Sequence, residues 1–278
     1  MMPASSPSYT RPPVTEVALA VYFSPSLNLR TAQLGKLWDR WRDRFPRTED
    51  QPPLPPIPLE SFAQPLPAFS FQFSGIFPGP RVWFLSETGD RVIQIQPDRL
   101  VLNWRHTTEE ETYPRYETLL PVFTKAARDL VAFLSEEGLS PPTIVQAEVT
   151  YVNPIPIDAL GDSRDLARLT TLWSGALSDE FLPTPEDVRL SIRYRIPDPS
   201  SGDPIGRLYV EGTPTFHQGL DSVKANEVFM LQLFARGKPL GEGLEGALAF
   251  LDVGHDWVVR GFTSLTTKRM HEEWGLEE

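Results

Sequence analysis

Short runs of alternating apolar and polar residues, interrupted by helical patterns, constrain this chain most. Thr15–Phe23 places Val17, Leu19, Val21 and Phe23 on one side, which indicates a strand with one buried face. Similar runs occupy residues 81–86, 91–96 and 100–105, with turn-forming residues between them. They predict a meander of short antiparallel strands, preceded by a further strand at Phe69–Phe73.

Two helical patterns lie on either side of this meander. Apolar residues recur at helical spacing over 34–45 until Pro46, and again over 119–133 until Gly138. Between the first helix and the meander, residues 46–67 are rich in proline, which removes backbone donors and favours extended geometry. This segment is interpreted as a connector.

The second half repeats the order of elements without repeating the sequence. An alternating run over 145–151 precedes a helical pattern over 166–173, with Asp162 or Ser163 as its cap. Further strands are predicted at residues 188–196, 206–210 and 228–235. A long helical segment, 246–274, follows them and has a possible break at Thr266-Thr267.

These elements predict an α+β fold with antiparallel sheets that helices cover on one face. The chain is read as two tandem units, each with a strand, a helix, three or four strands and a second helix. Residues 1–142 and 143–278 form these units, and one compact domain is the alternative. The order resembles TATA-binding-protein-like or helix-grip-like folds, an analogy that implies no function.

Composition excludes several classes of protein. The chain has no cysteine, so disulfides, thiolate metal sites and cysteine nucleophiles are ruled out. Its net charge of -11 disfavours non-specific attraction to nucleic acid or anionic lipid. The first residues lack the pattern of a secretory signal, and no run has the length of a membrane span. The expected location is the cytoplasm, with no membrane partner.

No cofactor or metal is expected. Gly241–Gly246 matches a dinucleotide fingerprint, but its glutamates would face a pyrophosphate and no βαβ unit follows. His271 has no second ligand at zincin spacing, and His106 and His217 have no partner at ligand spacing. The glycine-rich segment is therefore interpreted as the loop that begins a helix.

The polar faces of the strands carry the main candidate site. Side chains that alternate away from the expected core offer arginine forks, amides and one stacking phenol, which suit recognition of a partner. The candidate binding residues are Gln94, Gln96, Asn103, Arg105, Arg189, Arg193, Arg195, Arg207 and Tyr209. The competing interpretation is a solvated face whose arginines pair with carboxylates. A basic stripe of Lys36, Arg40, Arg44 and Arg47 has the same two interpretations.

An alternative site is a pocket between the curved sheet and the last helix. His255 lies in the apolar stripe of that helix, and Asp252 is nearby. A buried histidine with satisfied hydrogen bonds is the competing interpretation. The pocket hypothesis predicts a cavity beside His255.

Several blocks together resemble one protein family. They are Pro12–Val17, Val92–Trp104, Tyr113–Tyr116 and the stretch from His255-Asp256 to Trp274-Gly275. They are similar to a sporadically distributed, functionally uncharacterised prokaryotic family of about this length. The resemblance implies the patchy distribution typical of defence and toxin–antitoxin genes.

The leading functional prediction is a non-catalytic binding protein that uses its sheet faces. Its expected partner is a protein, as in the regulatory or antitoxin-like member of a gene pair, and nucleic acid is possible only through a local basic face. The alternative is a small-ligand-binding protein or enzyme that uses the pocket near His255. A self-associating subunit is a third possibility.

Overall fold

The computed structural model describes residues 6–62, 79–108, 112–160, 166–174, 181, 185–217 and 225–277. Within these residues the chain is an α+β protein, as predicted. The helices are α1 (Thr31–Trp41), α2 (Tyr116–Glu136), α3 (Gly243–Leu265) and α4 (Lys268–Trp274), with short 3-10 turns at Ile157–Leu160 and Leu166–Arg168. The strands are β1 (Ser8–Tyr9), β2 (Glu16–Phe23), β3 (Arg47–Gln51), β4 (Arg81–Leu85), β5 (Arg91–Gln96), β6 (Arg99–Arg105), β7 (Ile144–Pro156), β8 (Leu190–Pro197), β9 (Pro204–His217), β10 (Asn226–Gly237) and β11 (Leu276–Glu277).

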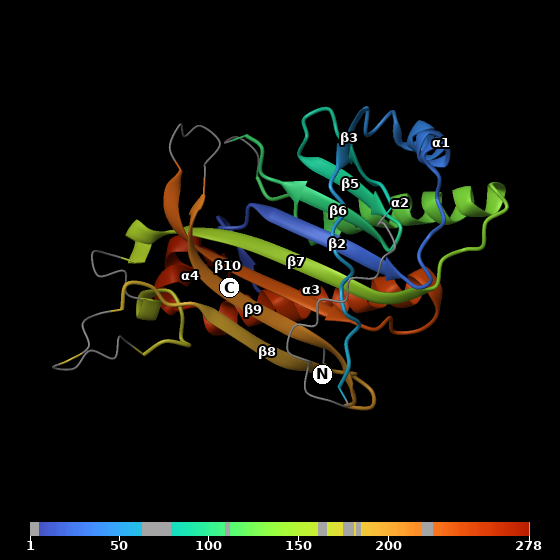
Figure 1. The fold of residues 1–278 in the computed structure, drawn as a ribbon. Coiled ribbons are helices and arrows are strands. Elements are labelled where there is room, and N and C mark those ends of the chain that lie inside the picture. Colours follow the sequence, from blue (N-terminus) through green and yellow to red (C-terminus); the bar gives the residue numbers. More distant parts are fainter. Residues whose placement is uncertain are drawn as a thin grey trace.

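Nine of the described strands form one antiparallel sheet in the order β3-β4-β5-β6-β2-β7-β10-β9-β8. The central pair joins the two halves of the sequence, with Val17 opposite Tyr151 and Leu19 opposite Val149. Outward from this pair, β6, β5 and β4 follow on one side and β10, β9 and β8 on the other. The halves therefore repeat one strand order within a continuous sheet, which Figure 1 shows face-on.

The two long helices pack on one face of this sheet. Helix α2 contacts β6, and α3 contacts β7, β10 and β9. Figure 1 shows both helices behind the sheet, so its other face, here called the helix-free face, is toward the viewer. The helices pack on this face because apolar side chains alternate toward it within each strand. Val17, Leu19 and Val21 are each at most 1% exposed on the helix side, and burying each contributes about 1.5–3 kcal/mol.

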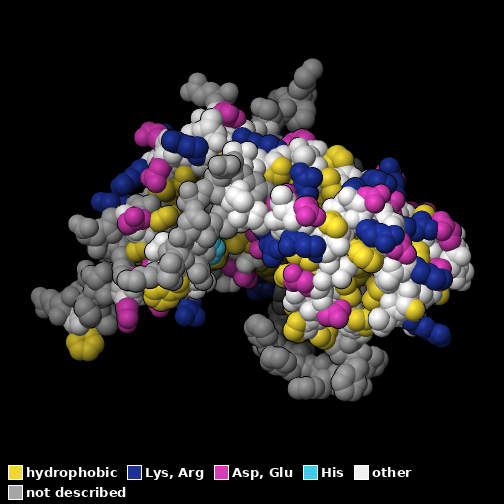
Figure 2. Space-filling view, turned by 90° about the horizontal axis from the view of Figure 1, so that it is seen from above, with side chains coloured by type: hydrophobic (Ala, Val, Ile, Leu, Met, Phe, Trp, Pro, Cys, Tyr) yellow, Lys and Arg dark blue, Asp and Glu magenta, His cyan; other side chains and the backbone are white. Residues whose placement is uncertain are grey.

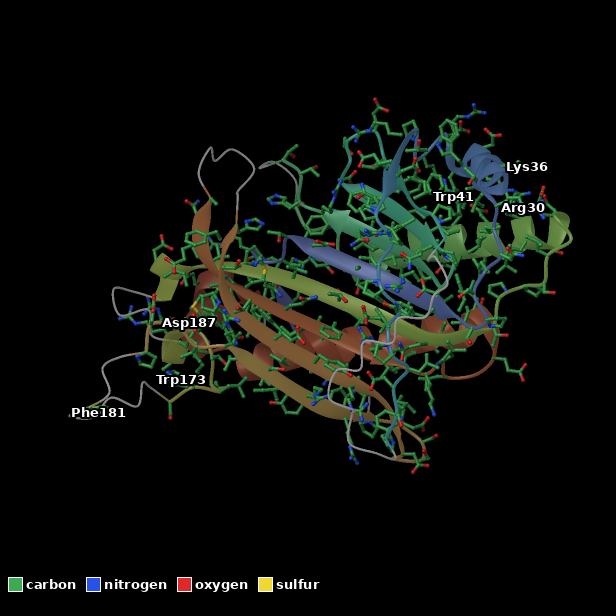
Figure 3. The ribbon with its side chains drawn as sticks, viewed as in Figure 1. Arg30, Lys36, Trp41, Trp173, Phe181 and Asp187 are labelled. Atoms are coloured by element: carbon green, nitrogen blue, oxygen red, sulfur yellow. The ribbon has the colours of Figure 1, made fainter. Side chains whose placement is uncertain are left out.

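Helix α1 is amphipathic and lies against α2 and the end of the sheet. Its Trp41 is fully buried, and its ring meets Phe84 edge-on at 5.3 Å between centroids. Figure 3 shows Trp41 on the sheet side of α1 and Lys36 on the opposite side. The helix ends at Trp41, so the predicted continuation to residue 45 is wrong, and residues 42–44 form a turn instead.

Two further predictions differ from the structure. Residues 166–173 contain only the turn Leu166–Arg168 instead of a helix, because Leu166 and Leu169 are buried as an irregular segment beside the end of α3. The connector over 46–67 begins with β3, whose Arg47–Gln51 has no proline and pairs with β4. The strand predicted at Phe69–Phe73 and the caps at Asp162 and Ser163 lie outside the described residues.

The two ends of the described chain are tied together. Ser8 and Tyr9 in β1 pair with Glu277 and Leu276 in β11. The Tyr9 ring packs edge-on against Phe262, with centroids 5.7 Å apart. The residues before β2 are therefore held against α3, where they form one wall of the cavity described below.

The long helical segment at the end of the chain is broken at Thr266 and Thr267, as predicted, with α3 before and α4 after the break. None of the described helices combines the length and apolarity that a membrane span requires.

Candidate functional site

The proline-rich segment 52–62 crosses the helix-free face and occupies part of the predicted binding surface. Gln96 accepts a hydrogen bond from the Leu54 N–H at 2.8 Å and donates to the Leu54 carbonyl at 2.9 Å. Arg99 donates to the Pro55 carbonyl at 2.7 Å, and Gln146 accepts from the Glu60 N–H at 2.9 Å. Figure 1 shows this segment running across the strands. Side chains of the sheet thus pair with backbone N–H and C=O groups of the segment, which forms no strand of its own.

Arg207 and Tyr209 hold the end of the same segment. Arg207 forms an ion pair with Glu60, donates to the Ser61 carbonyl at 2.7 Å, and lies over the Phe62 ring at 4.4 Å from its centroid. The Tyr209 hydroxyl also donates to Glu60. Burial, together with the Glu60 carboxylate, raises the pKa of Tyr209 to about 12. Both residues therefore bind a segment of their own chain.

A second group on this face forms an internal polar network. The Gln94 carbonyl oxygen accepts from the Trp83 indole at 2.9 Å, and Gln94 donates to Asn103, which in turn donates to Glu16. Arg105 donates to the Gly89 carbonyl at 3.1 Å and lies 5.4 Å from the Trp83 ring centroid. These residues point away from the helices as predicted, and most of their polar groups are used within the sheet, whereas Arg105 Nε is buried without a hydrogen bond among the described residues.

The predicted exposure of Gln96, Asn103 and Arg207 is therefore wrong. These side chains belong to residues that are 5%, 6% and 8% exposed. Alternation along a strand decides which face a side chain joins. It does not reveal that segment 52–62 covers Gln96 and Arg207, or that Asn103 is hydrogen-bonded between Gln94 and Glu16.

The arginines on and beside the edge strand β8 are exposed, unlike Arg207. Arg193 and Arg195 lie on β8, point to the helix-free face, and are exposed. Arg189 is exposed just before this strand. Tyr194, between Arg193 and Arg195, lies on the helix side but is 36% exposed because β8 is the last strand.

The basic stripe predicted along the first helix pairs mainly with acidic residues of α2 and its C-cap, but only Lys36 and Arg40 of the stripe lie on α1. Lys36 pairs with Glu137 at 2.8 Å, Arg40 with Glu136, and Arg44 with Asp129 at 2.9 Å. Arg47 instead donates to the Ser86 carbonyl at 3.2 Å. Figure 2 shows basic and acidic side chains interspersed over this part of the surface. The stripe thus stabilises helix packing at the surface, where each pair contributes up to about 1 kcal/mol.

A cavity lies beside His255, between α3, the sheet and the segment before β2, as the alternative hypothesis predicted. Its volume is about 140 Å³. We call it the tyrosine–histidine cavity. It is lined by Ser6, Pro7, Ser8, Tyr9, Pro12, Val14, Tyr113, Arg115, Tyr116, Glu117, Tyr151, Asn153, Leu233, His255, Val258, Val259 and Phe262.

A chain of hydrogen bonds forms the polar wall of this cavity. The hydroxyl oxygens of Tyr113 and Tyr151 are 2.8 Å apart, and the Tyr151 oxygen is 2.9 Å from His255 Nδ1. The Tyr116 ring stacks on the imidazole of His255, with centroids 4.0 Å and planes 4° apart. The Tyr116 hydroxyl donates to Asp252 at 2.8 Å. Asp252 is therefore a positioning group behind the stacked tyrosine instead of part of the cavity wall.

His255 and the three tyrosines that surround it in this wall are neutral at pH 7. Burial lowers the pKa of His255 below its ordinary value of 6.5, and nearby carboxylates oppose only part of this effect. Burial raises the pKa of Tyr113 and Tyr151 above the ordinary value of 10.0. Burial and the Asp252 carboxylate do the same for Tyr116. The wall therefore offers hydroxyl and imidazole groups without net charge.

Arg115 has a strained backbone where the chain enters α2. Its φ of 68° lies in the left-handed region, and it is the residue before the first turn of the helix. Its guanidinium donates to the Tyr9 carbonyl at 2.8 Å. Such a conformation costs on the order of 1–3 kcal/mol in a residue other than glycine and is concentrated at functional sites. Tyr113 and Tyr116, which flank this position in sequence, both line the cavity.

The sequence interpretation missed the tyrosines of this site. Tyr113 and Tyr116 were noted only as part of a family-like block, and Tyr151 only as a strand residue. The available signal was Tyr113 and Tyr116, which lie three residues apart where a helix begins. A second signal was Tyr151, a polar residue on the apolar face of a predicted strand. The contact between Tyr151 and His255 spans 104 residues of sequence, so no local pattern reveals it.

The other motifs have structural roles. His271 is within 2.9 Å of the Thr266 hydroxyl at the junction of α3 and α4. A side chain at Gly246 would meet the Gly241 carbonyl at 2.3 Å, so the glycines permit the tight turn that begins α3. No group of three or more His, Cys, Asp or Glu side chains suited to a metal occurs among the described residues.

The chain was also compared with known proteins. No model of a protein family matches it, and no curated protein shows a significant match to its sequence.

Proposed function

We propose that this chain is a small-molecule-binding protein and that the tyrosine–histidine cavity is its ligand site. The observation that carries the proposal is the relay Tyr113–Tyr151–His255 along the wall of a cavity of about 140 Å³. Buried polar groups are costly unless they are satisfied. A buried cavity with convergent polar groups and shifted pKa values is the usual form of a ligand site.

The ligand class follows from the size and charge of the cavity. Apolar cavities of about 150 Å³ accept molecules the size of benzene. The lining has one cationic and one anionic residue, Arg115 and Glu117, so its formal charge is zero when His255 is neutral. Because these two charges offset each other, a charged ligand would lose its hydration without a net compensating charge. The expected ligand is therefore a small neutral molecule with a flat ring.

The relay also defines one hydrogen-bonding position for the ligand. His255 Nδ1 is engaged by Tyr151, which leaves Nε2 without a hydrogen bond to any described residue. A neutral imidazole donates from one nitrogen and accepts at the other. Rotation of the two tyrosine hydroxyls, together with a change of the imidazole tautomer, reverses the relay, so Nε2 can serve either as donor or as acceptor. The ligand is expected to carry one polar atom that meets Nε2.

The finer predictions from sequence remain proposals. A helix-grip-like or TATA-binding-protein-like fold is supported by the position of α3 across the sheet and by the repeated strand order. Membership of the sporadic prokaryotic family, a role in a defence or antitoxin pair, and the cytoplasmic location stay predictions.

Binding of three probes of matched size tests the ligand site. Benzene has no polar atom, phenol donates a hydrogen bond, and pyridine accepts one. We expect phenol or pyridine to bind about fivefold to tenfold more tightly than benzene, because one hydrogen bond contributes up to about 1.5 kcal/mol. Isothermal titration calorimetry and ligand-observed NMR measure these affinities.

A histidine substitution provides the matched control. His255→Phe keeps a flat ring against Tyr116 but removes both nitrogens, so the preference for phenol or pyridine over benzene should disappear. The same substitution at His217, which lies on β9 and does not line the cavity, should preserve the preference. The proposal is wrong if none of the probes binds, or if His255→Phe retains the preference.

A further inference from the structure

In the described part of the chain, the outermost strand β8 has one edge without a strand partner and carries two exposed arginines. It is the last strand of the sheet, and within the described chain it pairs only with β9. Figure 1 shows it along the lower edge of the sheet. An edge strand presents backbone N–H and C=O groups that can pair with another extended segment.

The two arginines on this strand are not neutralised by the described residues. Arg193 lies opposite Tyr209 and Arg195 opposite Arg207, on the helix-free face. Arg207 is already paired with Glu60, and no described carboxylate lies within ion-pair distance of Arg193 or Arg195. In a chain of net charge -11, this edge is a local site of positive charge. It favours side chains of opposite charge.

An apolar groove lies on the other side of the same strand. It has a volume of about 300 Å³ and separates β8 from α3. Its lining comprises Tyr194, Leu208, Asp256, Trp257, Arg260, Gly261, Ser264 and Leu265. Arg260 is paired with Asp256 at 2.6 Å, so the charged residues of the groove offset each other. The groove therefore suits an apolar side chain that arrives from the edge.

We propose that β8 binds an extended segment of a partner protein, which adds to the sheet as a further strand. Successive side chains of a strand point to opposite faces. The segment would place acidic side chains, two residues apart, against Arg193 and Arg195. The side chain between them would enter the groove beside Trp257. The partner segment is thus an alternating acidic and apolar peptide, a chemistry distinct from the ligand proposed for the tyrosine–histidine cavity.

The structure disfavours the other occupants. A second copy that paired β8 with β8 would bring the arginines of the two strands close together, and like charges across a strand pair are destabilising. A nucleic acid would use the arginines but neither the strand edge nor the apolar groove. The opposite edge of the sheet, β3, carries Glu49 and Asp50, which would repel an acidic segment.

Fluorescence anisotropy with a labelled peptide of alternating Glu and Val tests the proposal on the full chain. We expect measurable binding, and a loss of at least about tenfold in affinity for Arg193→Glu/Arg195→Glu, because two charge-assisted contacts become repulsive. The control is Lys268→Glu/Arg269→Glu, which changes the net charge by the same amount at two exposed residues of α4. Its affinity for the peptide should stay within about twofold of that of the original chain. The circular dichroism spectra of both variants should match that of the original chain.

Two further probes distinguish strand addition from charge attraction. The same peptide with alternate backbone nitrogens methylated cannot donate to β8, and its affinity should fall about tenfold. A labelled single-stranded oligonucleotide should bind weakly and independently of the arginines. Three outcomes would overturn the proposal. The oligonucleotide could bind in place of the peptide, or the methylated peptide could bind as tightly as the original peptide. The chain could also form a dimer that Arg193→Glu/Arg195→Glu dissociates.

Discussion

Arg193 and Arg207 have the same side chain on neighbouring strands, and they face the same side of the sheet. Arg207 is 8% exposed against Glu60, whereas Arg193 is exposed at the edge. The difference comes from Glu60, which lies 147 residues from Arg207 in sequence. The chemistry of a residue therefore indicates what it can bind, and its tertiary neighbours decide what it does bind.

The buried ion pair predicts a large loss of stability at Glu60. Its side chain is 2% exposed and that of Arg207 is 10% exposed. Glu60→Ala should destabilise the protein by about 3 kcal/mol, because it leaves a buried guanidinium without its carboxylate. Urea denaturation measures this change. Glu137→Ala removes a surface pair with Lys36 and should cost much less than Glu60→Ala, because solvent screens an exposed pair. Equal losses in the two variants would contradict this account.

His255 predicts a dependence of stability on pH. Burial lowers its pKa in the folded state below the ordinary 6.5, so the unfolded state binds more protons. The contribution is therefore complete above 6.5 and is lost as the pH falls toward the folded pKa. The loss is at most about 1.4 kcal/mol per pH unit. Urea denaturation of the original chain and His255→Gln between about pH 5 and 7 should show a steeper loss in the original chain. An imidazole NMR titration with a midpoint above 6.5 would disprove the prediction.

At the scale of elements, two glycines let α3 approach the sheet. Gly206 and Gly237 face each other on β9 and β10, and the Phe250 ring of α3 lies over both. A Cβ at Gly237 would lie 2.4 Å from this ring. The strand patterns identify these positions as part of a buried face. The absence of a side chain there is explained by the helix above and by the adjacent backbone, since a Cβ at Gly237 would also lie 2.4 Å from the Ile205 carbonyl oxygen.

Gly237→Ala should therefore destabilise the protein by about 1–3 kcal/mol, because the added methyl group displaces Phe250. Adding Phe250→Leu should restore part of this loss. Gly35→Ala on α1 is a matched control, since nothing lies within 4 Å of its added Cβ. It should stabilise the helix by about 0.5–1 kcal/mol. Thermal unfolding of the three variants measures the differences, and a neutral Gly237→Ala would show that α3 can shift away from the sheet.

The proline-rich connector was only partly predictable. Its prolines predict an extended segment, but they do not indicate where on the sheet segment 52–62 lies. Gln96, Arg99 and Gln146 hold it on the helix-free face by hydrogen bonds to its backbone. Because these contacts join segments far apart in sequence, periodicity along the strands could not reveal them.

At the scale of the whole molecule, the sheet passes through the boundary between the two predicted units. Strand β2 of the first unit pairs with β7 of the second over most of its length. Each unit alone would leave one of these central strands as an open edge beside an apolar face. The repeated strand order identifies two similar halves, and the shared pair makes them depend on each other.

We therefore expect each half to aggregate or remain unfolded when residues 1–142 and residues 143–278 are expressed separately. The sheet should form only when the two halves are refolded together. Circular dichroism and cooperative thermal unfolding provide the measurement. The full chain, refolded under the same conditions, is the control. A monomeric half that unfolds cooperatively by itself would show that the shared strand pair is not required.

The sequence by itself determined the α+β class, most of the strands, the long helices and the break after α3, because alternation, helical spacing and turn residues are local signals. It also indicated His255 as a candidate beside a cavity. Only the tertiary structure decided that the halves share one sheet, that segment 52–62 covers the polar face, and that Tyr113 and Tyr151 reach His255. The physical reason is that pairing, coverage and burial depend on contacts between residues distant in sequence, which no local pattern encodes.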